Sequence, residues 1–277
     1  MKNQETFHRN APIGRLVVKV GTSLLTRDGG HLDRARMARF ARELSVVQKT
    51  GVQVVLVSSG AIAAGMGELG WKKRPSEVAK KQAAAAVGQP RLMETYRRFF
   101  RRRGVSVAQV LLTREDFENN TRRKNAQSTL STLLESGVIP IINENDTVAV
   151  EEIRVGDNDT LAAHVAVNVK ADLLVLLTDV EGLMTRHPRH GDGRLIRYVP
   201  KIGTAIEAIA HSLPGTDGGT GGMLTKIRAG RHATRHGVSM VIASGKKQGV
   251  LVRLAAGQLL GTFFAAIGRT AKMDNRK

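Results

Sequence analysis

The sequence lacks cysteine, has few aromatic residues and contains no long apolar run. The absence of cysteine excludes disulfides, thiolate zinc sites and a cysteine nucleophile. Aromatic residues make up only 4% of the chain, so a core must be built from valine, leucine, isoleucine and alanine. No apolar run approaches the roughly 18–20 residues that span a bilayer, and the polar N-terminus contains no apolar signal core. These absences favour a cytoplasmic protein with no membrane partner.

Acidic residues are also few, because 24 Asp and Glu face 43 Lys and Arg, which gives a formal net charge of +19. Such a charge makes nucleic-acid binding a rival hypothesis for any other function. Five arginines gather within seven positions, at Arg97, Arg98, Arg101, Arg102 and Arg103. No zinc-finger, leucine-zipper or aromatic RNA-binding pattern accompanies them, and clusters of this kind are often solvated faces. Nucleic-acid binding is therefore not the favoured interpretation.

The chain has 277 residues, of which 42% are apolar, enough for one large α/β domain or two small ones. Short apolar runs that suit buried strands alternate with segments of helical spacing. We predict strands at 13–20, 52–57, 105–112, 138–142, 172–177, 238–243 and 261–265, with a short one at 195–199. We predict helices at 32–50, 61–69, 119–136, 159–169, 202–209 and 222–236, and one at 75–103 that is interrupted near Gly88-Gln89-Pro90. This alternation indicates a mostly parallel sheet covered on both faces.

Polar residues follow several of the predicted strands at their carboxyl ends. In an open parallel sheet, ligands bind in the crevice beyond that edge. One such cluster would be weak evidence, since every strand ends in a turn, but five are hard to explain as solvated turns. The clusters are Lys19, Ser58-Ser59-Gly60, residues 143–146, Thr178-Asp179 and Ser244-Gly245.

Acidic residues concentrate between positions 143 and 159, in NENDTVAVEEIRVGDND. Segments of this composition suit binding an amino group, holding hydrated Mg²⁺ or fixing nearby lysines. The alternative is a solvated hairpin between two core elements. Six of the 24 acidic residues fall here: Glu144, Asp146, Glu151, Glu152, Asp157 and Asp159.

A glycine-rich segment, GTDGGTGGMLTK at 215–226, precedes a predicted helix. Glycine lets backbone N–H groups approach an anion, and a helix start favours phosphate. Lys226, one turn into the helix, would add a mobile cation. The segment is neither a Walker A loop nor GxGxxG, and a flexible surface loop is the alternative. His232 and His236 have metal-ligand spacing, but Arg231 and Arg235 beside them repel cations, so we interpret them as a solvated face.

Six motifs together resemble the glutamate 5-kinase family of the amino acid kinase superfamily: VVKVGTSLLT, SSGAIAAG, KQAAAAVGQPRL, INENDTVAVEEIRVGDND, LLTDVEGL and GTGGMLTK. The resemblance runs from about Leu16 to the closing DNRK. It implies a three-layer αβα sandwich with a mainly parallel eight-stranded sheet. It also implies ATP-dependent phosphorylation of the γ-carboxylate of L-glutamate, the first step of proline biosynthesis.

The resemblance also implies a domain organisation. We expect a kinase domain at 13–268, a flexible N-terminus at 1–12 and a tail at 269–277. Many relatives continue after a DNRK-like motif into an RNA-binding-like PUA domain, which we expect to be absent here.

Catalytic roles fall, by resemblance, on Lys19, Lys226 and Asp159. The acceptor carboxylate is already ionised at neutral pH, so no general base is needed. Two lysines from different elements would neutralise the transferring phosphoryl group, and Asp159 would hold them in register.

Substrate roles follow from the same motifs. Glutamate would be bound by Ser59, Asp146 and Asn158, with Asn143 and Asn145 nearby. Mg²⁺ would bridge the β- and γ-phosphates of ATP through water, and no protein metal ligand is predicted. The nucleotide would contact Lys19, Thr178, Asp179, Thr220, Gly221, Gly222, Met223, Leu224, Thr225 and Lys226.

Other properties stay open at this point. The alternatives within the superfamily are kinases for aspartate, N-acetylglutamate or carbamate. The family suggests feedback inhibition by proline, which resembles cyclised glutamate, and a homo-oligomer, either a dimer or a tetramer. Met184, Arg186 and His187 stand where the family commonly has a tyrosine and an Ala-Asp pair, so the adenine contacts are unassigned.

Overall fold

The computed structural model describes residues 12–27, 31–149, 158–186, 193–213 and 222–268. In this part of the chain, the strands form one eight-stranded sheet in the order β3-β4-β2-β1-β5-β7-β8-β6. The strands are β1 (Arg15–Val20), β2 (Gln53–Ser58), β3 (Val107–Leu112), β4 (Ile139–Glu144), β5 (Leu173–Thr178), β6 (Tyr198–Val199), β7 (Ser239–Ser244) and β8 (Thr262–Phe264). All neighbouring strands are parallel except β7 and β8, which are antiparallel.

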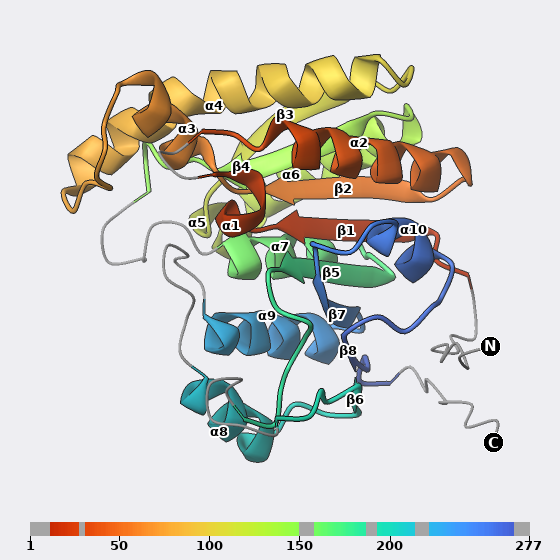
Figure 1. The fold of residues 1–277 in the computed structure, drawn as a ribbon. Helices are drawn as coiled ribbons and strands as arrows, with labels where there is room; N and C mark the ends of the chain where they lie inside the picture. The colour runs from red at the N-terminus through yellow and green to blue at the C-terminus, as the bar shows by residue number, and fades with distance from the viewer. Residues whose placement is uncertain (1–11, 28–30, 150–157, 187–192, 214–221, 269–277) are drawn as a thin grey trace.

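Helices pack on both faces of the sheet, as Figure 1 shows. They are α1 (Thr22–Leu25), α2 (Arg34–Lys49), α3 (Ala61–Glu68), α4 (Val78–Arg101), α5 (Glu115–Glu118), α6 (Asn120–Glu135), α7 (Asn158–Asn168), α8 (Thr204–Ser212), α9 (Met223–Arg235) and α10 (Val250–Ala255). One apolar cluster contains residues of α2, α3, α4 and α10, and the other contains residues of α6, α7 and α9. The predicted αβα fold with a mainly parallel eight-stranded sheet is confirmed.

Alternation along β1 decides which way its lysine points. Leu16, Val18 and Val20 belong to the cluster under α2 and α4, whereas Val17 belongs to the cluster under α7 and α9. Successive strand side chains point to opposite faces, so Lys19 shares the face of Val17. The sequence of β1 therefore directs this lysine toward α7 and α9.

The predicted interruption of the helix at Gly88-Gln89-Pro90 is wrong. The helix α4 runs unbroken from Val78 to Arg101 with Pro90 inside it. A proline removes one helical hydrogen bond, which normally ends or kinks a helix. Here α4 packs backbone to backbone against α3, since a Cβ added to Gly88 would lie 1.9 Å from the carbonyl oxygen of Ala61. This close packing outweighs the local signal of the proline.

Three smaller differences affect the sheet edge. The strand β4 extends two residues past its predicted end, so Asn143 and Glu144 belong to the strand. A single turn of helix, α1, follows Gly21 where only a break was expected, and α10 was not predicted. No helix in the described ranges is both long and apolar enough to cross a membrane.

Candidate active site

Two lysines and one aspartate meet at the carboxyl edge of the sheet. Lys19 lies near the end of β1, Asp159 in the first turn of α7 and Lys226 in the first turn of α9. Lys19 Nζ is 2.7 Å from Asp159 Oδ1, and Lys226 Nζ is 3.0 Å from Asp159 Oδ2. All three side chains are buried, with Asp159 only 1% exposed. The fold thus joins residues that stand 140 and 67 positions apart in the chain.

The two lysines determine the ionisation state of Asp159. Burial raises the pKa of Asp159, but the ammonium groups of Lys19 and Lys226 lower it by more, so its pKa lies well below the usual range. Asp159 therefore remains ionised throughout the physiological pH range. Two lysine ammonium groups thus converge on one buried carboxylate, and such a concentration of cations favours the binding of an additional anion. A phosphoryl group would supply that anion.

The first turn of α9 adds a hydroxyl to the same aspartate. The Thr225 hydroxyl lies 3.1 Å from Asp159 Oδ2 and 2.8 Å from the carbonyl oxygen of Gly222. Gly222 is the N-cap of α9 and, having no side chain, does not itself cap the free N–H groups there. An uncapped helix start beside two lysines is suited to phosphate. Thr220 and Gly221, the other predicted residues of this loop, lie outside the described part.

A second group of polar residues lines a pocket beside the lysines. Ser59, Asn143, Asp146 and Asn158 all border it, as the sequence predicted for an acceptor site. Asn158 Nδ2 donates to Ser59 Oγ at 2.9 Å and to Asn143 Oδ1 at 3.0 Å. Asn158 Oδ1 is buried and has no hydrogen-bond partner among the described residues. A ligand with a donor group would satisfy that oxygen.

The position of Asn143 depends on a hydrogen-bonded chain of amides that sequence reasoning missed. Asn143 Nδ2 donates to Gln89 Oε1 at 2.9 Å, and Gln89 Nε2 donates to Gln109 Oε1 at 3.1 Å. Gln89 comes from α4 and Gln109 from β3, so the chain ties the pocket to two further elements. The sequence signal was Gln89 itself, a polar side chain that directly follows the run of small and apolar residues AAAAVG.

Asp146 has an unusual environment for a carboxylate. Burial and the charge of Glu144 raise the pKa of Asp146 to about 7, although Arg74 lowers it in part. Arg74 and Glu144 also line the pocket, together with Thr22 and the start of α3. Neither was predicted as a site residue. Arg74 is an exposed arginine before α4 and stands in no motif, and Glu144 was noted only as part of the acidic segment. A buried carboxylate of raised pKa in a pocket is typical of a functional site.

The remaining predicted residues are placed less centrally. Thr178 ends β5, is buried, and donates to Asp179 Oδ1 at 3.1 Å, at the same edge of the sheet. Met223 is buried and Leu224 half-buried at the start of α9. Asn145 does not line the pocket; its Oδ1 accepts a hydrogen bond from Thr147 at 2.7 Å within the same turn. Glu151, Glu152 and the predicted hairpin lie outside the described residues.

Fold and site together are those of an α/β protein in which two lysines converge at the strand ends, an arrangement suited to binding a phosphoryl group, as a kinase requires. A model of the amino acid kinase family matches residues 14–244, more than half of the chain, so the chain belongs to that family.

Curated relatives define the place of the chain within the family. The glutamate 5-kinase of Burkholderia mallei (strain SAVP1) is 51% identical over 264 residues, which cover 95% of this chain and 70% of that protein. The glutamate 5-kinase of Caldanaerobacter subterraneus subsp. tengcongensis is also 51% identical, over 90% of this chain and 67% of that protein. Within the amino acid kinases, the chain thus belongs to the glutamate 5-kinase family.

Proposed function

We propose that this chain transfers the γ-phosphoryl group of ATP to the γ-carboxylate of L-glutamate, the first step of proline biosynthesis. The observation that carries the proposal is the buried cluster in which Lys19 and Lys226 share Asp159. Two lysines that converge from different elements suit a reaction that brings two anions together. Catalysis of this kind depends on positioning and charge neutralisation rather than on proton transfer.

The lysines act on the transferring group. Lys19 and Lys226 each contact its oxygens, and Asp159 fixes the distance between their ammonium groups. The γ-carboxylate of glutamate is ionised at neutral pH and attacks phosphorus without a base. The bond from phosphorus to the bridging oxygen breaks, and ADP leaves with the electron pair.

The adjacent pocket holds the amino-acid end of glutamate. Asp146 pairs with the ammonium group, and the buried Asn158 Oδ1 accepts a hydrogen bond from it. Ser59 and the backbone at Gly60 bind the α-carboxylate, which also faces the charge of Arg74. The amide chain through Gln89 keeps Asn143 and Asn158 in the orientation that this requires.

ATP enters as its Mg²⁺ complex, and the metal screens the β- and γ-phosphates. No group of three or more histidine, aspartate or glutamate side chains able to hold a metal occurs among the described residues. Both oxygens of Asp159 already contact lysines, so this carboxylate is engaged within the cluster. Thr178, Asp179 and the start of α9 bind the nucleotide, with Thr220 and Gly221 assigned from the sequence alone.

A hydroxylamine trapping assay tests the proposal. With ATP, Mg²⁺ and L-glutamate, the acyl phosphate should form a hydroxamate while ADP is released in equal amount. Aspartate, N-acetylglutamate and carbamate, tested in the same assay, separate the alternatives within the family. Glutamate-independent ADP release, or a clear preference for another acceptor, would contradict the proposal.

Glutamate binding should depend on pH through Asp146. Only the ionised carboxylate attracts the substrate ammonium, and the raised pKa of about 7 means that Asp146 gains a proton below neutrality. We expect kcat/KM for glutamate to fall about tenfold per pH unit below that pKa. Asp146→Asn should abolish this acidic limb and raise KM about 10–100-fold at pH 8, since it removes a charge-assisted contact.

Glu144→Gln provides the companion variant for this prediction. The charge of Glu144 raises the pKa of Asp146, so its removal should move the acidic limb to lower pH. An Asp146→Asn variant that kept the limb at its original position would show that another group titrates.

The resemblance to the family also supports proposals on regulation, assembly and location. The chain is a cytoplasmic homo-oligomer, a dimer or tetramer, that L-proline inhibits by competing for the glutamate pocket. Light scattering measures the assembly, and a proline titration at several glutamate concentrations measures the competition. A monomer, or inhibition independent of glutamate concentration, would contradict these statements.

A further inference from the structure

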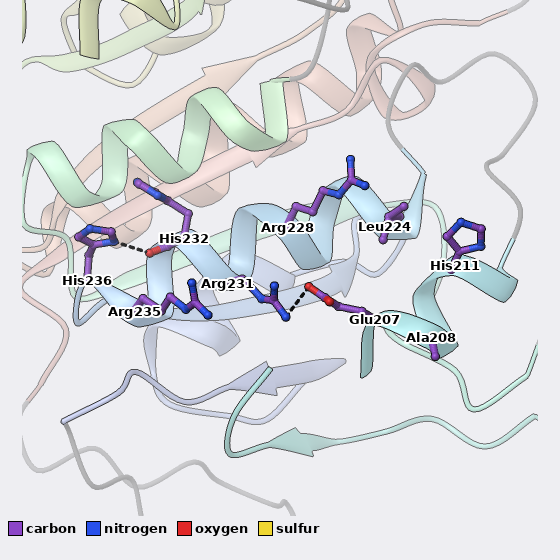
Figure 2. A pocket seen from close by; sticks show the side chains of 9 residues that line it. All are labelled: Glu207, Ala208, His211, Leu224, Arg228, Arg231, His232, Arg235 and His236. Carbon is purple, nitrogen blue, oxygen red and sulfur yellow. Dashed lines mark hydrogen bonds and ion pairs between the residues drawn. The ribbon is translucent and has the colours of Figure 1, made fainter. Parts of the chain in front are cut away.

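A large basic pocket lies between α8 and α9, away from the lysine–aspartate cluster. Its volume is about 650 Å³, within the range of small-molecule sites. Figure 2 shows the arginine side chains projecting from α9, with Glu207 and His211 on α8. Six basic or imidazole groups line it: His211, Arg228, Arg231, His232, Arg235 and His236.

Helical spacing explains how α9 serves two sites. Arg228, Arg231 and Arg235 recur at intervals of three and four residues, which places them on one face of the helix. Lys226 stands two positions before Arg228 and therefore about 200° around the helix axis. The pocket face and the catalytic face of α9 are thus opposite sides of one helix. Of the residues assigned to catalysis and to the nucleotide, Leu224 borders the pocket, whereas Lys19, Asp159 and Lys226 do not.

The charges in this pocket are not balanced within the described structure. In the described part of the chain, Glu207 is the one acidic residue that lines it, and its Oε1 lies 2.6 Å from Arg231 Nη2. Among the described residues, no carboxylate lies within ion-pair distance of Arg228 or Arg235. The Nε of Arg231 is buried and also lacks an acceptor there. The pocket thus keeps two guanidinium charges and one buried donor available for a ligand.

The histidines of the pocket pack against one another and against α7. His232 was expected on a solvated face, but it is half-buried, with its ring 4.3 Å from that of His164 on α7 and 4.5 Å from that of His236. Burial and these two neighbours lower the pKa of His232 to about 4, so it is neutral at pH 7. A neutral imidazole adds polar contacts without adding charge.

We propose that the pocket between α8 and α9 is a second binding site, which takes a small anion with two or more phosphate groups. Arg228 and Arg235 are seven positions apart, about 10 Å along the helix, so each binds a different anionic group. Guanidinium groups form strong, paired hydrogen bonds with phosphate. The concave shape favours a small ligand over a nucleic-acid backbone, which would need an extended basic surface.

Calorimetric titration with inorganic tripolyphosphate tests the site. The titration is performed at about 0.15 M salt to screen non-specific attraction, and with ADP present to occupy the nucleotide site. The double variant Arg228→Gln/Arg235→Gln should bind tripolyphosphate at least about tenfold more weakly than the unsubstituted chain, because it loses two charge-assisted contacts. Its kinase activity without tripolyphosphate should be unchanged.

Arg97→Gln/Arg98→Gln is the matched control. It removes the same charge from the exposed face of α4, so it should leave tripolyphosphate binding within about twofold. Equal affinity in the unsubstituted chain and the pocket variant would overturn the proposal. A second result would also overturn it. In that result, a mixed-sequence RNA oligonucleotide would bind through Arg228 and Arg235, and tripolyphosphate would fail to displace it.

Discussion

Replacing Lys226 by methionine is expected to lower kcat by about 10²–10³, as does the loss of one preorganised donor to a developing negative charge. Methionine keeps the length and the apolar stem of lysine but removes the ammonium group 3.0 Å from Asp159. The contact of Lys226 with the phosphoryl group strengthens as charge builds up in the transition state. KM for glutamate should therefore change little, since the amino-acid pocket is intact. Steady-state kinetics with saturating ATP measures both constants.

Lys226→Met should destabilise the folded protein less than Asp159→Asn does. In Lys226→Met, the carboxylate keeps Lys19 at 2.7 Å and the Thr225 hydroxyl at 3.1 Å. Asp159→Asn would instead remove the carboxylate that two buried ammonium groups share, which is the costlier change. Lys124→Met, on the exposed side of α6, controls for the change of charge and should retain full activity. A kcat of Lys226→Met within fivefold of the unsubstituted chain would remove Lys226 from the transfer step.

The catalytic cluster shows what the sequence could predict. The short apolar run at 13–20 predicts a strand, and a glycine-rich loop before a helix predicts an anion site near Lys226. Neither pattern states that two lysines meet on one carboxylate, because that distance depends on the pairing of β1 with β5 and on the packing of α7 against α9. The roles came from the resemblance, and the geometry came from the fold.

The amino-acid pocket shows where local patterns fail. Asn143, Asp146 and Asn158 stand in motifs with an assigned role, whereas Arg74 stands in none and Gln89 stands in KQAAAAVGQPRL, to which no role was assigned. Gln89 reaches Asn143 because α4 continues through Pro90, which local rules predict to interrupt it. The signal that decides this point is non-local. It is the pair of small residues on each of two helices, Ala61 and Gly65 on α3 and Ala84 and Gly88 on α4, that lets the backbones touch.

Gly88→Ala should therefore destabilise the protein by about 3 kcal/mol, at the upper end for a methyl group forced into a packed interior. The new Cβ would lie 1.9 Å from the carbonyl oxygen of Ala61 and 2.3 Å from the backbone nitrogen of Gly65. Backbone atoms cannot turn aside as a side chain can, so α3 and α4 must separate. This loss would exceed the gain of about 1 kcal/mol that alanine offers over glycine inside a helix. Urea denaturation followed by circular dichroism measures the difference.

Gly230→Ala in α9 is the matched control, because it makes the same change in another helix. Its Cβ would meet the tip of Met240, 2.3 Å from Cε, and a methionine side chain can move away. The two substitutions should thus differ in sign, with Gly230→Ala near neutral or slightly stabilising. Gly88→Ala should also raise KM for glutamate, since the start of α3 lines the pocket and α4 carries Gln89. Equal stability of both variants would mean that backbone contact between α3 and α4 is not what carries the helix through Pro90.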